Sequence, residues 1–405
     1  MLSDTDTAVF PACGAHAAVR SPLAPVALAS AVWLWAAPEA ATALATRDLP
    51  TILRTYRRVH SMSQIALAEL LGYDKSYVSM IETGRRAISD ISSRRHIARR
   101  LGLPAHVLGV TDTDDAEYLA MLQFGDSTVR LAELARQSGH ATQAVNELWP
   151  LVARLEARAA TGHTEPDSLA LLARARVALG VSLGTVLPEE RLTTAAQWTG
   201  QALAIARRLD DSGFLAHTLR MHGNELRKAG DPASAVTHLE QALALSADPI
   251  EQGSTLAPLC RAIGELGDAE RFDTTLSIYR RLLDQHAGSG LLFHPFTFRE
   301  VQLRGLIDTG RAAAALRLLG TEHAAPAAPQ WHIIERVTTG QTLTLAHETT
   351  AAETAFSQAL HAAEHHRLPH QIQRAVRALS TAGMHALAEE ARAALARVRA
   401  LLDTP

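Results

Sequence analysis

The sequence contains few cysteines and few aromatic residues. Its 405 residues include only two cysteines, Cys13 and Cys260, which lie far apart. Two isolated cysteines support neither a disulfide framework nor a cysteine-based metal motif, so we expect a reducing compartment. Aromatic residues make up 4% of the chain, whereas alanine and leucine dominate a hydrophobic fraction of 47%. This composition favours helices over sheets.

The sequence also lacks the motifs of common enzyme and metal sites. No glycine-rich phosphate loop and no Ser/His/Asp or Cys/His constellation stands out. Four histidines lie close together late in the chain, at His361, His365, His366 and His370. Two histidines one helical turn apart, without a further ligand at suitable spacing, make a poor zinc site. We therefore expect no catalytic residues, no bound metal and no cofactor.

Residues 61–86 have the pattern of a helix-turn-helix. Ser63 can cap a first helix, and Gly72 can end that helix in a left-handed conformation that costs glycine little. Asp74 is positioned to cap a second helix, which Gly84 closes. The apolar residues expected to face inward are Leu67, Leu70, Leu71, Val78 and Ile81, with the small Ala68 at the helix crossing. Such a hairpin presents its second helix to the major groove of DNA.

From about Leu49 to Leu108 the sequence resembles the phage-repressor (Cro/cI, or XRE-type) DNA-binding family. The matching positions are Leu53, Arg57, Arg58, Ser63, Gln64, Ala68, Gly72, residues 76–79, Ile81, Glu82 and residues 84–86, with Ile91, Ile97, Ala98, Leu101 and residues 102–104 on and after a following helix. The resemblance implies a lambda-repressor-like helical domain that binds double-stranded DNA.

The outward side chains of the second helix carry the chemistry for DNA recognition. In this family the start of that helix enters the groove, so Lys75 and Ser76 are expected to meet base edges, and Met80 a thymine methyl. Ser79 lies on the same outward face. Residues better placed for phosphates, which fix register without reading sequence, are Gln64, Tyr77, Thr83, Arg85 and Arg86.

Two residues of the hairpin have alternative roles. The Tyr77 ring either approaches a phosphate or only buttresses the hairpin. Glu82 is expected to pair with an arginine of an adjacent helix rather than to touch DNA.

The charge distribution separates a basic N-terminal part from an acidic remainder. Residues 47–110 contain eleven Arg or Lys and five Asp or Glu, a balance of +6. Residues 111–405 contain 27 basic and 34 acidic residues, a balance of −7. A basic module is the electrostatic pattern expected of a protein that binds a polyanion.

The N-terminal segment divides into two parts. Residues 1–25, with scattered Pro, Gly and Ser, are expected to be disordered. The apolar stretch Pro25–Ala37 resembles a signal-peptide core, but it is shorter than the ~20 residues that span a bilayer. We expect it instead to form a helix whose Trp33 and Trp35 pack on the hairpin, followed by a short helix over Pro38–Thr46. The DNA-binding domain is thus predicted at residues 26–110.

Residues 111–405 have the pattern of paired helices. Gly223 and Gly230 suit a close helix contact and a turn, and Ala235, Leu239 and Ala242 follow on the next helix. A large residue recurs in the second helix of each pair, at Thr199, Leu239, Tyr279, Leu319 and Phe356, with small residues at Ala195, Ala202, Ala235, Ala242, Ala315, Ala352 and Ala359. A period of 34 to 47 residues indicates a helical solenoid. This part resembles degenerate tetratricopeptide (TPR) repeats, beginning near Ala144 and Leu148 and capped by a helix over Leu387–Leu402.

The first helix of each TPR pair lines a concave surface that remains available for binding. The best repeat carries four polar residues along one helix face, at His217, Arg220, Asn224 and Arg227, and Arg299 and Arg304 could extend it. An asparagine between guanidiniums can hold a peptide backbone and its carboxylate. The alternative is an ordinary solvated helix face.

The order of the two parts resembles all-α cytoplasmic helix-turn-helix/TPR regulators. That resemblance implies a nucleoid-associated transcriptional regulator that binds DNA as a homodimer, with a peptide or small ligand in the TPR groove and no membrane contact. The alternative is a TPR interaction scaffold whose helix-turn-helix no longer binds DNA. The basic and hydroxyl-bearing face at Lys75, Ser76, Arg85 and Arg86 favours the regulator, because a non-functional domain is expected to lose it.

Overall fold

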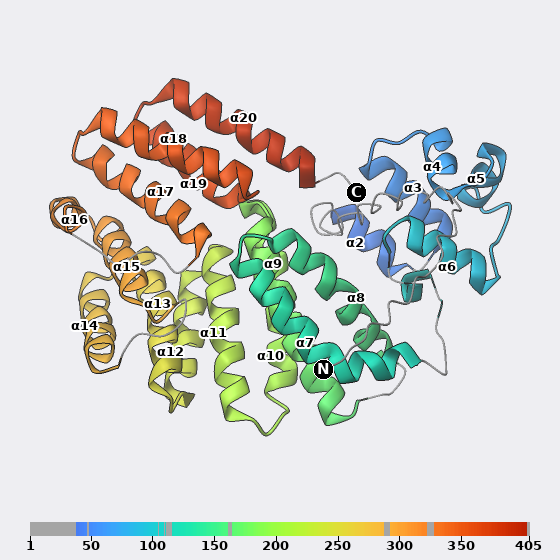
Figure 1. The fold of residues 1–405 in the computed structure, drawn as a ribbon, viewed down its shortest axis with the longest axis horizontal. Helices are drawn as coiled ribbons and strands as arrows, with labels where there is room; N and C mark the ends of the chain where they lie inside the picture. The colour runs from blue at the N-terminus through green and yellow to red at the C-terminus, as the bar shows by residue number, and fades with distance from the viewer. Residues whose placement is uncertain are drawn as a thin grey trace, which may run out of the picture.

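The protein is helical throughout the part of the chain that the structure describes. The computed structural model describes residues 38–46, 48–103, 105–108, 110, 116–160, 164–286, 292–321 and 328–402, and these residues contain no strand (Figure 1). The all-α prediction is therefore confirmed. The expectations for residues 1–37, including the helix with Trp33 and Trp35, lie outside the described residues.

A compact module of short helices precedes the long helices. Its elements are α2 (Pro38–Ala45), α3 (Leu49–Val59), α4 (Gln64–Leu71), α5 (Lys75–Glu82), α6 (Ile91–Arg100) and the 3-10 helix η1 (Ala105–Leu108). Side chains cap three of the helices as their sequences suggest: Asp48, Ser63 and Asp90 accept hydrogen bonds from the backbone N–H groups of Thr51, Ala66 and Ser93.

The hairpin of α4 and α5 has the predicted turn and core. Gly72 has φ 72°, the left-handed conformation expected at the end of α4. The buried core residues include Leu53, Leu67, Ala68, Leu71, Val78 and Ile81, joined by Ile97, Ala98 and Leu101. One predicted detail is wrong: Asp74 is at the N-cap of α5, but its side chain makes no capping hydrogen bond. Leu70 is half-buried and packs against the core from the edge of the apolar stripe.

In the described part of the chain, seven antiparallel helix pairs follow. They are α7 (Ala116–Gln137) with α8 (Ala141–Ala160), α9 (Pro166–Val186) with α10 (Leu192–Ala206), α11 (Ser212–Lys228) with α12 (Pro232–Leu245), α13 (Pro249–Glu265) with α14 (Ala269–Gln285), α15 (Pro295–Asp308) with α16 (Ala312–Leu319), α17 (Pro329–Leu345) with α18 (Thr349–His365), and α19 (Pro369–Thr381) with α20 (His385–Leu402). The described residues therefore form a TPR-like α-solenoid, as the 40-residue spacing predicted.

The repeating residues make the contacts within pairs. The small and large residues of the second helices are fully buried, apart from the half-buried Leu319. Glycines of three first helices, Gly180, Gly223 and Gly340, lie against the large residues Thr199, Leu239 and Phe356 of their partners. A β-carbon at Gly340 would lie 2.8 Å from the Phe356 ring. The glycine in the first helix and the large residue in the second are thus complementary in shape.

The solenoid curves until its last pair meets an early one. In Figure 1, α17 to α20 curve back above α9 and α11, and α19 contacts α9. The 3-10 helix η2 (Glu189–Arg191) is bound at this contact: Gln373 of α19 accepts from the Glu189 N–H and donates to the Glu190 carboxylate, both at 2.9 Å. Arg377 pairs with Glu189, and Arg399 of α20 pairs with Glu190. The first helices are thereby arranged around a common interior.

One helix among the described residues, α9, is long and apolar enough to cross a membrane, and 72% of its apolar window is buried inside the protein. Because α9 packs against α8 and α10, it is a core helix of the solenoid.

Candidate nucleic-acid interface and solenoid cavity

The N-terminal half of α5 projects from the basic module. Val78 and Ile81 are fully buried and hold the helix against α3 and α4. Because the buried residues occupy one face of the helix, the other side chains point outward: Lys75 and Ser76 are exposed, and Met80 is 38% exposed. The residues predicted to read bases therefore share one accessible face.

Glu82 fixes the orientation of this helix. Its carboxylate is buried and accepts hydrogen bonds from Arg57 Nε at 2.9 Å and Gln64 Nε2 at 2.6 Å. Arg54 donates to the Glu82 carbonyl at 2.8 Å, which satisfies one of the free carbonyls at the helix end. The predicted pairing of Glu82 with an arginine of an adjacent helix is confirmed. Gln64 is tied to this network, and its phosphate contact stays a prediction.

The remaining predicted phosphate contacts lie around the end of α5. Arg85 and Arg86 are exposed, and the Arg86 guanidinium lies 5.3 Å from the centre of the Tyr77 ring. Tyr77 is half-buried and packs edge-on against Tyr73 at 5.1 Å, so the ring does support the hairpin. Thr83 is exposed, but its hydroxyl donates to the Ser79 carbonyl at 2.8 Å. Ser79 itself is half-buried.

Residues 53–94 match the family model described as Helix-turn-helix. This range contains α4, the turn at Gly72, α5 and the buried Glu82 network. The N-terminal module is an XRE-type helix-turn-helix. The match ends within α6, and the TPR-like body lies outside it.

Two solved structures show limited likeness to the whole chain. A putative kinesin light chain from Podospora anserina with nearly identical TPR-like repeats is 20% identical over 55% of this chain and 97% of its own, with a TM-score of 0.35. Bacillus thuringiensis PlcR, solved in complex with the peptide PapR7 and DNA, is 16% identical over 85% of this chain and 99% of its own, with a TM-score of 0.29. No curated protein matches the sequence. The XRE-type assignment therefore depends on residues 53–94.

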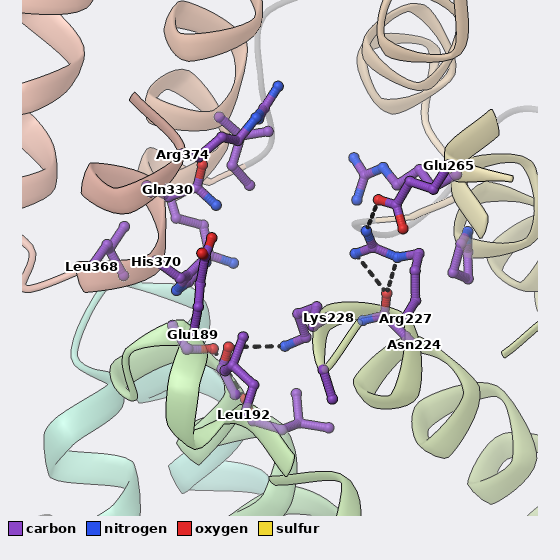
Figure 2. A pocket seen from close by; sticks show the side chains of 18 of the residues that line it. Glu189, Leu192, Asn224, Arg227, Lys228, Glu265, Gln330, Leu368, His370 and Arg374 are labelled. Atoms are coloured by element: carbon purple, nitrogen blue, oxygen red, sulfur yellow. Dashed lines mark hydrogen bonds and ion pairs between the residues drawn. The ribbon is translucent and has the colours of Figure 1, made fainter. Parts of the chain in front are cut away.

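The TPR-like body encloses a cavity of about 470 Å³. The residues that line it come from the first helix of every pair and from the segments that follow, among them Arg136, Thr185, Glu189, Met221, Asn224, Arg227, Lys228, Pro258, Arg261, Glu265, Arg304, Trp331, Ile334, His370, Arg374 and Arg377. Figure 2 shows Asn224, Arg227 and Glu265 on one side of the cavity, with His370 and Arg374 opposite.

The cavity brings together only half of the predicted ligand residues. Asn224, Arg227 and Arg304 line it. His217 and Arg220 precede them on α11 but lie outside the lining, because Arg220 is buried in an ion pair with Glu251 of α13 at 2.9 Å and bonds His217. The predicted continuous face therefore opens onto the cavity only at its C-terminal half.

Arg299 is the other predicted ligand residue that lies outside the cavity lining. Its guanidinium donates to the Leu318 and Leu319 carbonyls at the end of α16, at 3.2 and 3.0 Å, and pairs with Glu335. Such contacts satisfy the free carbonyls of a helix C-terminus. In this structure Arg299 holds α16 in place.

Sequence reasoning missed several cationic residues of the cavity, at Arg136, Lys228, Arg261, Arg374 and Arg377. A signal was present, because an arginine recurs towards the end of the first helices α11, α13 and α15, at Arg227, Arg261 and Arg304. That the last helices also contribute could not be inferred from spacing, since it depends on the curvature of the solenoid.

Burial shapes the electrostatics of the cavity. Arg227 and Arg304 hold the pKa of the Glu265 carboxyl below its usual range, against the opposing effect of burial, so Glu265 is ionised. Burial, assisted by the nearby charge of Lys228, lowers the pKa of His370 to about 3, so this imidazole is neutral at physiological pH. Burial and the charge of Arg304 lower the pKa of Arg374 to about 9.

Proposed function

We propose that this protein is a sequence-specific DNA-binding transcriptional regulator that acts in the cytoplasm, on the nucleoid. The observation that carries the proposal is the exposed face of α5, where Lys75 and Ser76 stand on a fully buried base of Val78 and Ile81. Lysine can donate to guanine O6 and N7, and a serine hydroxyl can serve several bases. A scaffold with a non-functional domain has no need to keep this face or the Glu82 network beneath it.

The TPR-like body is proposed to hold two copies together. One hairpin reads only a few base pairs, so specificity calls for two half-sites about one helical turn, ~34 Å, apart. Helix α7 follows the DNA-binding module and exposes Phe124, Leu131 and Leu134, which are 58%, 65% and 59% accessible. Their spacing of seven and three residues puts them on one stripe, the pattern of a helix that packs against an identical partner. A second copy of α7 would cover this stripe.

The body is further proposed to respond to a peptide or small ligand within the solenoid. Support comes from the cavity that the first helices surround, and from Asn224 with Arg227 and Arg304 on its wall. A ligand that binds one curvature of the solenoid better than another changes the separation of the two DNA-binding modules. A tenfold change in DNA affinity requires ~1.4 kcal/mol of differential binding.

The proposal is tested by selecting DNA sequences that bind the full-length protein and measuring affinity against salt concentration. With ~6 phosphate contacts, log affinity is expected to fall with log salt at a slope of about −5, because bound counterions are released. A protein that enriches no sequence, or whose weak binding has a flat salt response, is not a DNA-binding regulator of this kind.

A further inference from the structure

The interior of the solenoid concentrates basic side chains. Of the residues that the structure describes, seven cationic ones line the cavity, at Arg136, Arg227, Lys228, Arg261, Arg304, Arg374 and Arg377, against two acidic ones, Glu189 and Glu265. The solenoid as a whole carries the opposite balance, since residues 111–405 contain more acidic than basic residues. The cationic residues are therefore collected at this place rather than spread over the body.

Most of these cations have carboxylate partners. Arg227 and Arg304 share Glu265, at 2.5 and 3.3 Å. Three others pair singly: Lys228 with Glu225, Arg261 with Glu300 and Arg377 with Glu189. Since one carboxylate serves two guanidiniums at Glu265, the acids around the cavity do not match its cations one for one.

Two of the seven, Arg136 and Arg374, form no ion pair among the described residues, and Arg374 is the one that points to a ligand. Arg374 is 7% exposed, its Nη2 donates to neutral oxygens of Thr338 and Gln341, each at 2.7 Å, and its Nη1 has no hydrogen-bond partner. Among the described residues no carboxylate lies within ion-pair distance of it. Glu300 and Asp308 attract the Arg374 charge from beyond that distance, but burial and the charge of Arg304 outweigh them. A buried charge without a direct partner is costly unless something pairs with it. The low pKa of Arg374 agrees with that cost.

The size and the apolar walls of the cavity restrict what can fill it. About 470 Å³ lies within the range of small-molecule pockets. Apolar side chains cover parts of the wall, among them Leu192, Met221, Trp331 and Ile334. An inorganic ion would leave these surfaces uncovered, whereas a small organic molecule would contact them and the cations together.

We propose that the cavity binds a small organic polyanion whose carboxylate or phosphate groups pair with Arg374 and, across the cavity, with Arg227. This inference rests on the proposed role of the body as a sensor and names the chemistry sensed. Charge-assisted hydrogen bonds to buried guanidiniums orient the ligand. Because Arg374 is on α19 and Arg227 on α11, the ligand links the last pair to the middle of the solenoid and favours the closed curvature.

The test measures binding of two organic probes, citrate for carboxylates and fructose 1,6-bisphosphate for phosphates, to the full-length protein by titration calorimetry at fixed ionic strength. Saturable binding of at least one probe, one molecule per chain, is expected. Arg374→Met should weaken that binding by about 10- to 100-fold, because a charge-assisted hydrogen bond is lost. The matched control is Arg176→Met, which removes a mostly buried arginine paired with Glu156 outside the cavity, and it should leave the affinity unchanged.

Thermal unfolding separates a ligand-binding arginine from a structural one. Arg374→Met should unfold at the same or a higher temperature than the unmodified protein without probe, because it removes a buried charge that forms no ion pair, and it should lose the rise that the probe causes. Arg176→Met should lower the melting temperature and keep that rise. A lower melting temperature of Arg374→Met with unchanged probe affinity would make Arg374 structural and overturn the proposal.

Further outcomes are also decisive. No saturable binding of either probe overturns the proposal, as does binding only of an uncharged extended peptide. Should Arg374→Met not fold, Arg227→Gln, on α11, takes its place and must weaken probe binding. DNA affinity is measured without probe in the same preparations, so loss of the anion site is distinguishable from failure of the DNA-binding function.

Discussion

At the scale of single residues, α5 combines a buried residue that anchors the helix, Glu82, with exposed residues that are available to contact DNA. Its carboxylate anchors the helix to Arg57 and Gln64, while the side chains beyond the core remain free for DNA. Lys75 forms no ion pair among the described residues and lies on the exposed face. Residues that read bases and residues that hold phosphates should therefore respond differently to substitution.

Lys75→Ala should relax base preference at one position of each half-site and cost ~1–3 kcal/mol for the preferred sequence. The double variant Arg85→Ala with Arg86→Ala should weaken binding to all sequences alike and reduce the salt slope, because phosphate contacts carry no sequence information. Binding of both variants to a panel of single-base operator substitutions measures the difference. Identical specificity profiles would remove Lys75 from base recognition.

Buried histidines make stability depend on pH. Burial lowers the pKa of His217 to about 3, of His222 to about 4 and of His370 to about 3. Below pH 6.5, the ordinary pKa of histidine, these side chains bind protons in the unfolded chain while they remain neutral in the folded chain. The free energy of unfolding should therefore fall as pH decreases from 7 towards 4, by at most about 1.4 kcal/mol per pH unit for each histidine.

Denaturant unfolding at pH 7 and pH 5 measures this dependence. His222→Asn keeps a hydrogen-bonding group near Thr199, which His222 contacts at 2.9 Å. This variant should reduce the loss of stability between the two pH values, because one of the histidines with a lowered pKa is removed. An unchanged loss would show that His222 is not buried in its neutral form.

At the scale of elements, the close packing of paired helices depends on glycines, which have no side chain. A β-carbon at Gly223 of α11 would lie 2.8 Å from Leu239 Cγ and 3.2 Å from the Ala235 carbonyl oxygen of α12. A glycine elsewhere on α11, Gly213, has no such neighbour, since only Asp211 Oδ1 comes near, at 3.5 Å. The two positions form a matched pair on one helix.

Gly223→Ala should lower the free energy of unfolding by about 1–3 kcal/mol, because α11 and α12 must separate to accept the methyl group. Gly213→Ala should be neutral or stabilise by up to about 1 kcal/mol, because alanine favours helix. Chemical denaturation of both variants gives the comparison. Equal effects at the two positions would contradict the close approach of the two helices.

At the scale of the whole molecule, the proposed dimer places two DNA-binding modules on one operator. Phe124→Asp combined with Leu131→Asp should convert a dimer into a monomer in sedimentation, since charges would enter the apolar stripe of α7. Operator affinity should fall because the dimer is lost, while the circular dichroism of the helices stays unchanged. The control Leu245→Asp alters a residue on α12 that is 41% exposed and outside the stripe. If the double variant is still a dimer, the dimer interface lies on another surface.

The sequence by itself determined the features that depend on neighbours along the chain. Ser63 and Gly72 fix the ends of α4 through capping and a left-handed turn. The recurring alanines and large residues fix the second helices, because each repeat packs on the next one in sequence. These interactions are local, so their spacing alone predicted the helix-turn-helix and the helix pairs.

Only the tertiary structure decided the composition of the cavity. Arg136 lies on the first helix pair and Arg374 on the last, and they line one cavity because small rotations between successive pairs add up over the whole solenoid. The same accumulation brings Gln373 to η2. Arg220 and Arg299 matched the spacing of ligand residues, yet Glu251 and the end of α16 engage them instead. The residue types were visible in the sequence, but their partners depend on curvature, which no local pattern records.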